Sequence, residues 1–163
     1  MALLRLLRRL KRQTRGAALV EFTLLAPLLL LLMCGLAEFA NALREYHIMA
    51  KGVRDAARYL AHVPATPPCV ATDPNWAGAI TDAKHLAVYG TVSGGTALFK
   101  TWTDVNTVSV DYATCLTNPR VNGNPLPKIT VTASALYADL GMFGLMGVTP
   151  PTLTVSHQEL RVS

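Results

Sequence analysis

The stretch from Ala17 to Ala37 reads AALVEFTLLAPLLLLLMCGLA and decides the fold of this 163-residue chain. It contains one charged residue, Glu21, in twenty-one positions. About 20 apolar residues, each with a rise of 1.5 Å, span the ~30 Å hydrocarbon core of a bilayer. A small soluble domain buries only one face of a helix, so a helix that is apolar on all sides does not suit it. The stretch therefore predicts a transmembrane helix over residues 17–37.

The segment before this helix, residues 1–16, is basic. Six of the fifteen Lys and Arg residues lie in it, and the formal net charge of +5 becomes −1 when it is left out. Lys and Arg that flank a span stay on the cytoplasmic side. We therefore expect a single-pass protein of the inner (cytoplasmic) membrane, with its C-terminal part periplasmic or extracellular. The other basic residues are scattered, so no nucleic-acid-binding surface is expected.

Three kinds of export signal compete for the N-terminal region. A secretory signal peptide has an apolar region of about 7 to 15 residues, and this run is longer. A lipoprotein signal would place its cleavage box at Leu31 to Cys34, but Met33 is bulky where that box needs a small residue. The third kind, a prepilin leader, is short and basic and ends in a glycine, as residues 1–16 do at Gly16. A residue without a side chain eases the approach of a protease to the backbone.

The residues from Arg15 to Phe22, RGAALVEF, resemble the cleavage motif of type IV prepilins. That motif has a glycine before the cut, a glutamate as the fifth mature residue, and then an aromatic. The longer string RGAALVEFTLLAPLLLLLMCGLAEFA resembles the TadE-like family of minor pilins, or pseudopilins, of the Tad (Flp-type) pilus. The resemblance also covers residues 53–61, VRDAARYLA, and fades after about residue 62.

This resemblance implies a structural or assembly role in a pilus used for secretion and adhesion, without enzymatic activity. A prepilin peptidase would cut between Gly16 and Ala17, and the other partners would be pilins, pseudopilins and inner-membrane assembly proteins. Phe22 stands where the major pilins of this system usually have Tyr, which favours a minor pilin. The alternative is a signal-anchored exported binding domain that is unrelated to pili.

Glu21 and the neighbouring Phe22 are predicted to form an assembly contact. A carboxylate inside the membrane costs about 2.5 to 3.5 kcal/mol unless it is paired or neutralised. Cleavage after Gly16 would free an amine on Ala17, one helical turn from Glu21, so the amine can approach this carboxylate or that of an adjacent subunit. The alternative is an interfacial Glu21 without a role.

Pro27 lies inside the predicted span and cannot donate a backbone hydrogen bond. We expect a kink or local unwinding there, which membrane helices tolerate when neighbours satisfy the freed carbonyl. The sequence leaves open whether the bend is a functional hinge or harmless.

Residues 38–62 predict an amphipathic continuation of the helix, which ends by Val63 because prolines follow it. Its apolar stripe packs either on the chain's own domain or on partner helices. The stripe consists of Leu36, Phe39, Leu43, Tyr46, Ala50, Val53, Ala57 and Leu60.

Residues 63–163 predict a small exported α+β domain. A short helix is expected over residues 77–89, ended by Gly90, after a proline-rich loop. Alternation of apolar residues predicts strands over 105–112, 128–137 and 152–162, in an antiparallel sheet of about three to four strands. A tight turn is expected at Asn122 and Gly123. The segment GMFGLMG, residues 141–147, forms either a contact for partners or lipid or a cover for the core edge.

Cys69 and Cys115 form a candidate disulfide of the exported domain, whereas Cys34 lies in the apolar run. The alternative is two unpaired thiols. The four histidines lie far apart in sequence, and no catalytic or metal-ligand motif is present. The sequence therefore predicts no enzyme, no cofactor, no metal site and no small-molecule substrate.

Overall fold

The computed structural model describes residues 14–67, 69–117 and 125–161. The chain forms two compact units that divide between Ala40 and Asn41. The predicted α+β fold is confirmed: a long N-terminal helix leads into a small domain with a short helix and a three-stranded antiparallel sheet. The predicted leader falls largely outside the described residues, and so does the predicted turn at Asn122 and Gly123.

The long helix α2 runs from Thr14 to His62 and ends where the prolines predict. The last carbonyl groups of a helix have no partner within it and must be satisfied by other groups. Here the guanidinium group of Arg161 donates a hydrogen bond to the carbonyl oxygen of Leu60 in the last turn of α2, at 3.4 Å, and another to that of Ala65, just after the helix, at 2.6 Å. Arg161, which follows the last strand, therefore bonds to the end of this helix and to the loop after it.

The short helix α3 runs from Trp76 to Tyr89, one residue longer at its start than predicted. Before it, the carboxylate of Asp73 accepts a hydrogen bond from the amide of Asn75, at 2.9 Å. After it, Gly90 has a φ of 75°, and its amide donates to the carbonyl of Leu86. This left-handed conformation suits glycine because it has no Cβ, and it ends the helix as predicted.

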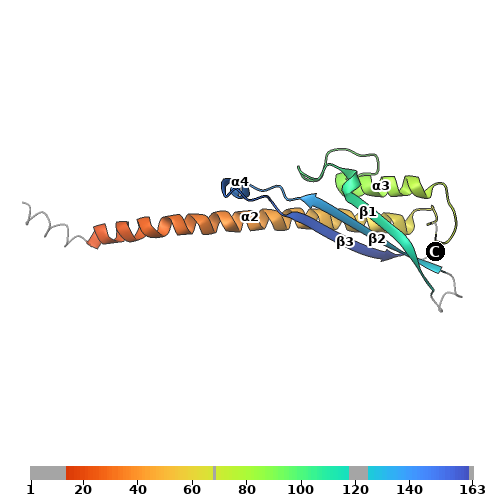
Figure 1. Cartoon of the computed structure of the whole chain (residues 1–163), viewed down its shortest axis with the longest axis horizontal. Coiled ribbons are helices and arrows are strands. Elements are labelled where there is room, and N and C mark those ends of the chain that lie inside the picture. Colours follow the sequence, from red (N-terminus) through yellow and green to blue (C-terminus); the bar gives the residue numbers. More distant parts are fainter. Residues whose placement is uncertain (1–13, 68, 118–124, 162–163) are drawn as a thin grey trace, which may run out of the picture. The chain divides into compact units, whose positions relative to one another are not determined.

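The sheet has the strand order β1-β2-β3, with β2 in the centre (Figure 1). Its strands are β1, Val108–Thr117, β2, Pro125–Leu136, and β3, Thr152–Leu160. In the register, Val110 pairs with Val131, and Val131 pairs with His157. Both pairings are antiparallel, as predicted.

The predicted start of the first strand was wrong. Residues Val105–Thr107 form the 3-10 helix η1, in which the Asp104 carboxylate accepts a hydrogen bond from the amide of Asn106 at 2.8 Å. An aspartate that bonds to the backbone two residues later favours a turn over a strand. The strand therefore begins at Val108 and continues to Thr117, beyond the predicted end, with a register irregularity between Asp111 and Thr114.

One face of the sheet is buried. Along β2 the side chains of Ile129, Val131 and Ala133 are fully buried, whereas Thr130 and Thr132 between them are partly exposed, because successive side chains point to opposite faces. The core cluster also contains Met49, Val53, Ala56, Ala57 and Leu60 of α2 and Trp76, Ala79, Ala83, Ala87 and Val88 of α3.

The predicted apolar stripe of α2 packs on the chain's own domain only toward the C-terminal end of the helix, and packing of the rest on partner helices stays a prediction. Val53, Ala57 and Leu60 are buried in the core as expected. Leu43 and Tyr46 are exposed, and so are Leu36 and Phe39. In contrast Glu45, which lies outside that stripe, is buried, with 4 % of its surface exposed. The side of α2 that packs on the rest of the domain therefore differs in part from the apolar stripe.

Candidate functional site

The N-terminal part of α2 exposes an unusual number of large apolar side chains. From Leu19 to Met33 every leucine of the described helix is exposed, and so are Val20 and Phe22. Monomeric soluble proteins rarely expose a continuous apolar surface of this size. This is the one helix of the described residues that is long and apolar enough to cross a membrane. A single N-terminal apolar helix of this kind indicates a single-pass membrane anchor.

Gly16 lies in the first turn of α2 and is exposed. A Cβ atom added there would meet nothing within 4 Å. Packing within the described residues therefore gives no reason for a glycine, although glycine in a helix costs about 1 kcal/mol relative to alanine. The helical backbone at Gly16 differs from the extended form that a protease accepts, so cleavage there requires the first turn to unwind.

Ala17, Glu21 and Phe22 also lie on α2. Residues four apart lie on the same face of a helix, so the spacing places the backbone of Ala17 one turn before Glu21. The side chains of Glu21 and Phe22 are exposed. This part of the helix therefore presents a single carboxylate on an otherwise apolar surface.

Pro27 lies within α2, which remains helical on both sides of it. The structure thus shows no local unwinding at Pro27, and a bend there stays a prediction. The free Cys34 of the same helix is exposed.

The sulfur atoms of Cys69 and Cys115 are bonded in the structure, at 2.07 Å, and the two Cα atoms are 6.0 Å apart. The bond joins the loop that follows α2 to strand β1. It closes a loop with a sequence separation of 46 residues. Disulfides persist in oxidising compartments, so this bond suits a domain outside the cytoplasm.

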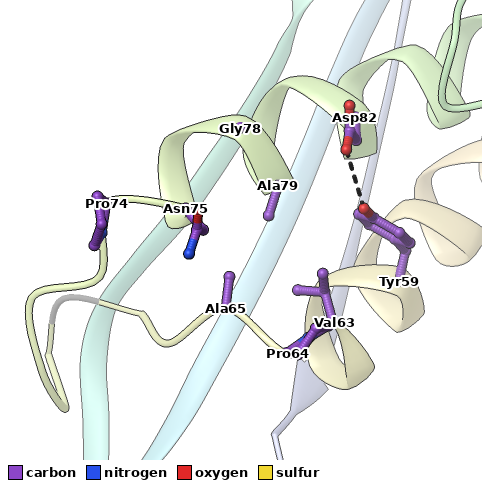
Figure 2. Close-up of a pocket in the computed structure, with 9 residues that line it drawn as sticks. All are labelled: Tyr59, Val63, Pro64, Ala65, Pro74, Asn75, Gly78, Ala79 and Asp82. Carbon is purple, nitrogen blue, oxygen red and sulfur yellow. Dashed lines mark hydrogen bonds between the residues drawn. The ribbon is translucent and has the colours of Figure 1, made fainter.

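A hollow of about 410 Å³ lies between the end of α2 and the start of α3 (Figure 2). The hydroxyl of Tyr59 points toward Asp82 and donates a hydrogen bond to its carboxylate at 3.2 Å. Burial, the hydrogen bond to Asp82 and the negative charge of Asp82 all raise the pKa of Tyr59 above its ordinary value. The remaining lining is mostly Pro, Ala, Val and Gly, so the hollow offers no set of acid, base and nucleophile.

Metal ligands do not gather elsewhere in the described part of the chain, where no three side chains of His, Cys, Asp or Glu come together. His157 and Glu159 form a pair on β3, with Nε2 and Oε2 3.3 Å apart. Two ligands do not complete a tetrahedral site.

Residues 16–58 match the family model described as TadE-like protein. The matched segment, which lies within α2, is similar to TadE-like proteins. The match confirms the resemblance that the sequence shows, and it supports a pilin-like component associated with a Tad pilus. The TadE-like family is a structural, pilin-like family rather than a family of enzymes. No curated protein and no solved structure matches the chain.

The TadE-like segment contains two polar residues whose role the sequence did not reveal. Asn41 donates hydrogen bonds from Nδ2 to the carbonyl of Ala138 at 3.0 Å and to the hydroxyl of Tyr137 at 3.2 Å. Glu45 accepts one from the amide of Ala138 at 3.0 Å. Their spacing of four residues on one helix face was a local signal, but their partner lies more than ninety residues later.

Proposed function

We propose that this chain is a minor pilin or pseudopilin of a Tad pilus, matured by a prepilin peptidase that cuts between Gly16 and Ala17. The observation that carries the proposal is the TadE-like match, which begins at Gly16 and includes Glu21. The exposed apolar helix that follows supports an anchor that holds the chain in the membrane before assembly.

The proposed domain organisation follows from the same features. Residues 1–16 are the leader, residues 17–37 cross the inner membrane, residues 38–62 continue the helix outside it, and residues 63–163 complete the exported domain. The basic leader supports a cytoplasmic N-terminus. The disulfide between Cys69 and Cys115 supports an exported domain.

Gly16 is proposed to serve the peptidase rather than the fold. Glycine has a low helix propensity, so it weakens the turn of α2 that contains it. Because an added Cβ at Gly16 would meet nothing within 4 Å among the described residues, we expect the weakened turn to open without disturbing a packed contact at that position. The peptidase can then take the backbone in extended form.

Glu21 is proposed to act in assembly, after cleavage has freed the amine of Ala17. The two opposite charges neutralise one another within or between subunits, which offsets the cost of a carboxylate in the apolar membrane. Other pilins and the inner-membrane assembly proteins are the proposed partners of this surface. Its function is therefore the contact between subunits, without chemistry of its own.

The test is substitution of Glu21 in the full chain, in a host that assembles the pilus. We expect Glu21→Ala to abolish or sharply reduce pili and adhesion while the protein still fractionates with the membrane. Cys34→Ala is the matched control, because Cys34 is exposed on the same apolar helix and is not bonded. Normal piliation and adhesion with Glu21→Ala would contradict the assembly role.

A further inference from the structure

The connection between β2 and β3, residues 137–151, lies at one defined end of the exported unit. Its first residues, Tyr137 and Ala138, contact Asn41, where this unit begins. At the opposite end of the helical segment, Arg161 after β3 contacts Leu60. The connection therefore lies at the end of the unit from which the chain leads back to the apolar helix.

The base of this connection is fixed to α2. The carbonyl and amide of Ala138 bond to Asn41 and Glu45 respectively, both at 3.0 Å. Tyr137 is buried, and its ring meets the ring of Phe143 edge to face with the centroids 6.1 Å apart. The connection is therefore held in place at its start, and its apolar surface is presented in a defined position.

The tip of the connection is a compact turn with an apolar surface. It contains the helical turn α4, Met142–Leu145, and the amide of Val148 donates to the carbonyl of Phe143 at 2.9 Å. Leu145 is 88 % exposed, and Leu140, Met146 and Val148 are also exposed. No charged residue occurs between Asp139 and His157. We name residues 140–148 the apolar tip.

Chain length alone keeps the base of the apolar tip close to the membrane. Asn41 follows Ala37, the last residue of the apolar run, by four residues. Four residues reach at most about 14 Å even when fully extended, whatever the arrangement of the two units. The base of the tip, bonded to Asn41, therefore stays near the membrane surface. This step rests on the proposed anchor.

We infer that the apolar tip inserts into the lipid interface of the same membrane that holds the helix. An uncharged turn with exposed Leu, Met and Val loses unfavourable contact with water when it enters the boundary between headgroups and acyl chains. The tip gives the exported unit a second attachment to the membrane beside the helix. Extraction of the chain into a pilus must release both attachments.

The test uses the full chain in phosphatidylcholine vesicles, with an environment-sensitive NBD label on a single cysteine. Leu145→Cys carries the label in the tip, in a Cys34→Ala background, while the bonded Cys69 and Cys115 do not react. Leu160→Cys is the matched control, because Leu160 is also an exposed leucine but lies beside Arg161 at the opposite end of the unit. Flotation with the vesicles measures the anchor separately.

We expect both labelled chains to float with the vesicles. The label at residue 145 should show blue-shifted emission and lose most of its intensity to nitroxide groups attached to lipid headgroups, and the label at residue 160 should do neither. Floating chains with an aqueous label at residue 145 would overturn the inference and leave the anchor intact. Chains that fail to float would overturn the anchor and the inference together. If the label at residue 145 is shielded from water only when pilus proteins are added, the tip contacts a protein partner. That result would overturn the lipid contact.

Discussion

Gly52 of α2 lies directly against the backbone carbonyl of Ala87 in α3. Both residues are buried, and a Cβ atom on Gly52 would overlap that carbonyl oxygen. A glycine inside a helix costs about 0.5 to 1 kcal/mol relative to alanine, so its presence needs a reason. The close approach of the two helices supplies one.

Gly52→Ala should therefore destabilise the exported unit by about 1 to 3 kcal/mol, the usual cost of overpacking, despite the better helix propensity of alanine. Gly78→Ala is the matched control, because Gly78 lies in α3 with nothing within 4 Å of an added Cβ. It should stabilise the unit by about 0.5 to 1 kcal/mol. Urea unfolding of the full chain in detergent measures the free energy of unfolding of both variants. Equal changes in that free energy for the two substitutions would contradict the close contact at Gly52.

The disulfide should contribute strongly to the stability of the exported unit. It restricts the unfolded chain over a separation of 46 residues, and a loop of that length corresponds to about 3 to 4 kcal/mol in the chain-entropy account. We expect the double substitution of Cys69 and Cys115 by Ser to lose about this amount in urea unfolding. Cys34→Ser is the control and should lose nothing. Free alkylation of all three thiols in the native protein would show that the bond is absent.

Asp73 should make stability depend on pH in the acidic range. Its carboxylate accepts hydrogen bonds from the amides of Thr66, at 2.7 Å, and Asn75, at 2.9 Å, and these bonds hold its pKa below the ordinary value of 3.8. A lowered pKa in the folded state stabilises the protein above the unfolded value, and this contribution is lost as the pH falls through the folded value.

Asp73→Asn should consequently melt at a lower temperature than the unsubstituted chain at neutral pH. The difference should shrink as the pH falls below 3.8, because the native carboxylate then also becomes neutral. Melting followed by near-ultraviolet circular dichroism at a series of pH values measures this. A difference that stays constant from neutral to acidic pH would show that the two amides do not favour the charged form.

The parts of the fold that depend on neighbouring residues in the sequence could be predicted from it. Pro64 and Gly90 end the two helices because of their own backbone preferences. The alternation of apolar and polar residues along β2 indicates which of its side chains are buried. The start of β1 differs from the prediction because Asp104 bonds to the backbone and forms a turn, which is also a local signal in the sequence.

The side of α2 that packs in the core could not be predicted from the sequence, because segments far along the chain determine it. Leu43 and Tyr46 belong to the same apolar stripe as Val53, but only Val53 among these three is buried in the core. Glu45 has a polar side chain, yet it is buried, and the amide of Ala138, 93 residues later, donates a hydrogen bond to it. Periodicity identifies an apolar face, and only the tertiary partners determine which side of the helix they cover.

Part of the candidate site could be predicted from the sequence. The TadE-like segment was identified from the residues around Gly16 and Glu21, because a short motif and a long apolar run are visible without a fold. The hydrogen bonds from Asn41 to Tyr137 and Ala138, just before the apolar tip, could not be predicted, since they join residues 96 to 97 positions apart. A hydrogen bond over that separation has no local signal in the sequence.

The central claim is that the chain is a pilin-like precursor, and the mass of its mature N-terminus tests that claim most directly. Intact-mass and N-terminal peptide spectrometry of the membrane protein, from a host with an active prepilin peptidase, should find a chain that begins at Ala17. Gly16→Ala should accumulate the uncut chain with unchanged membrane insertion, because no packed contact depends on Gly16 among the described residues. A protein that still begins at Met1 in that host would contradict the account.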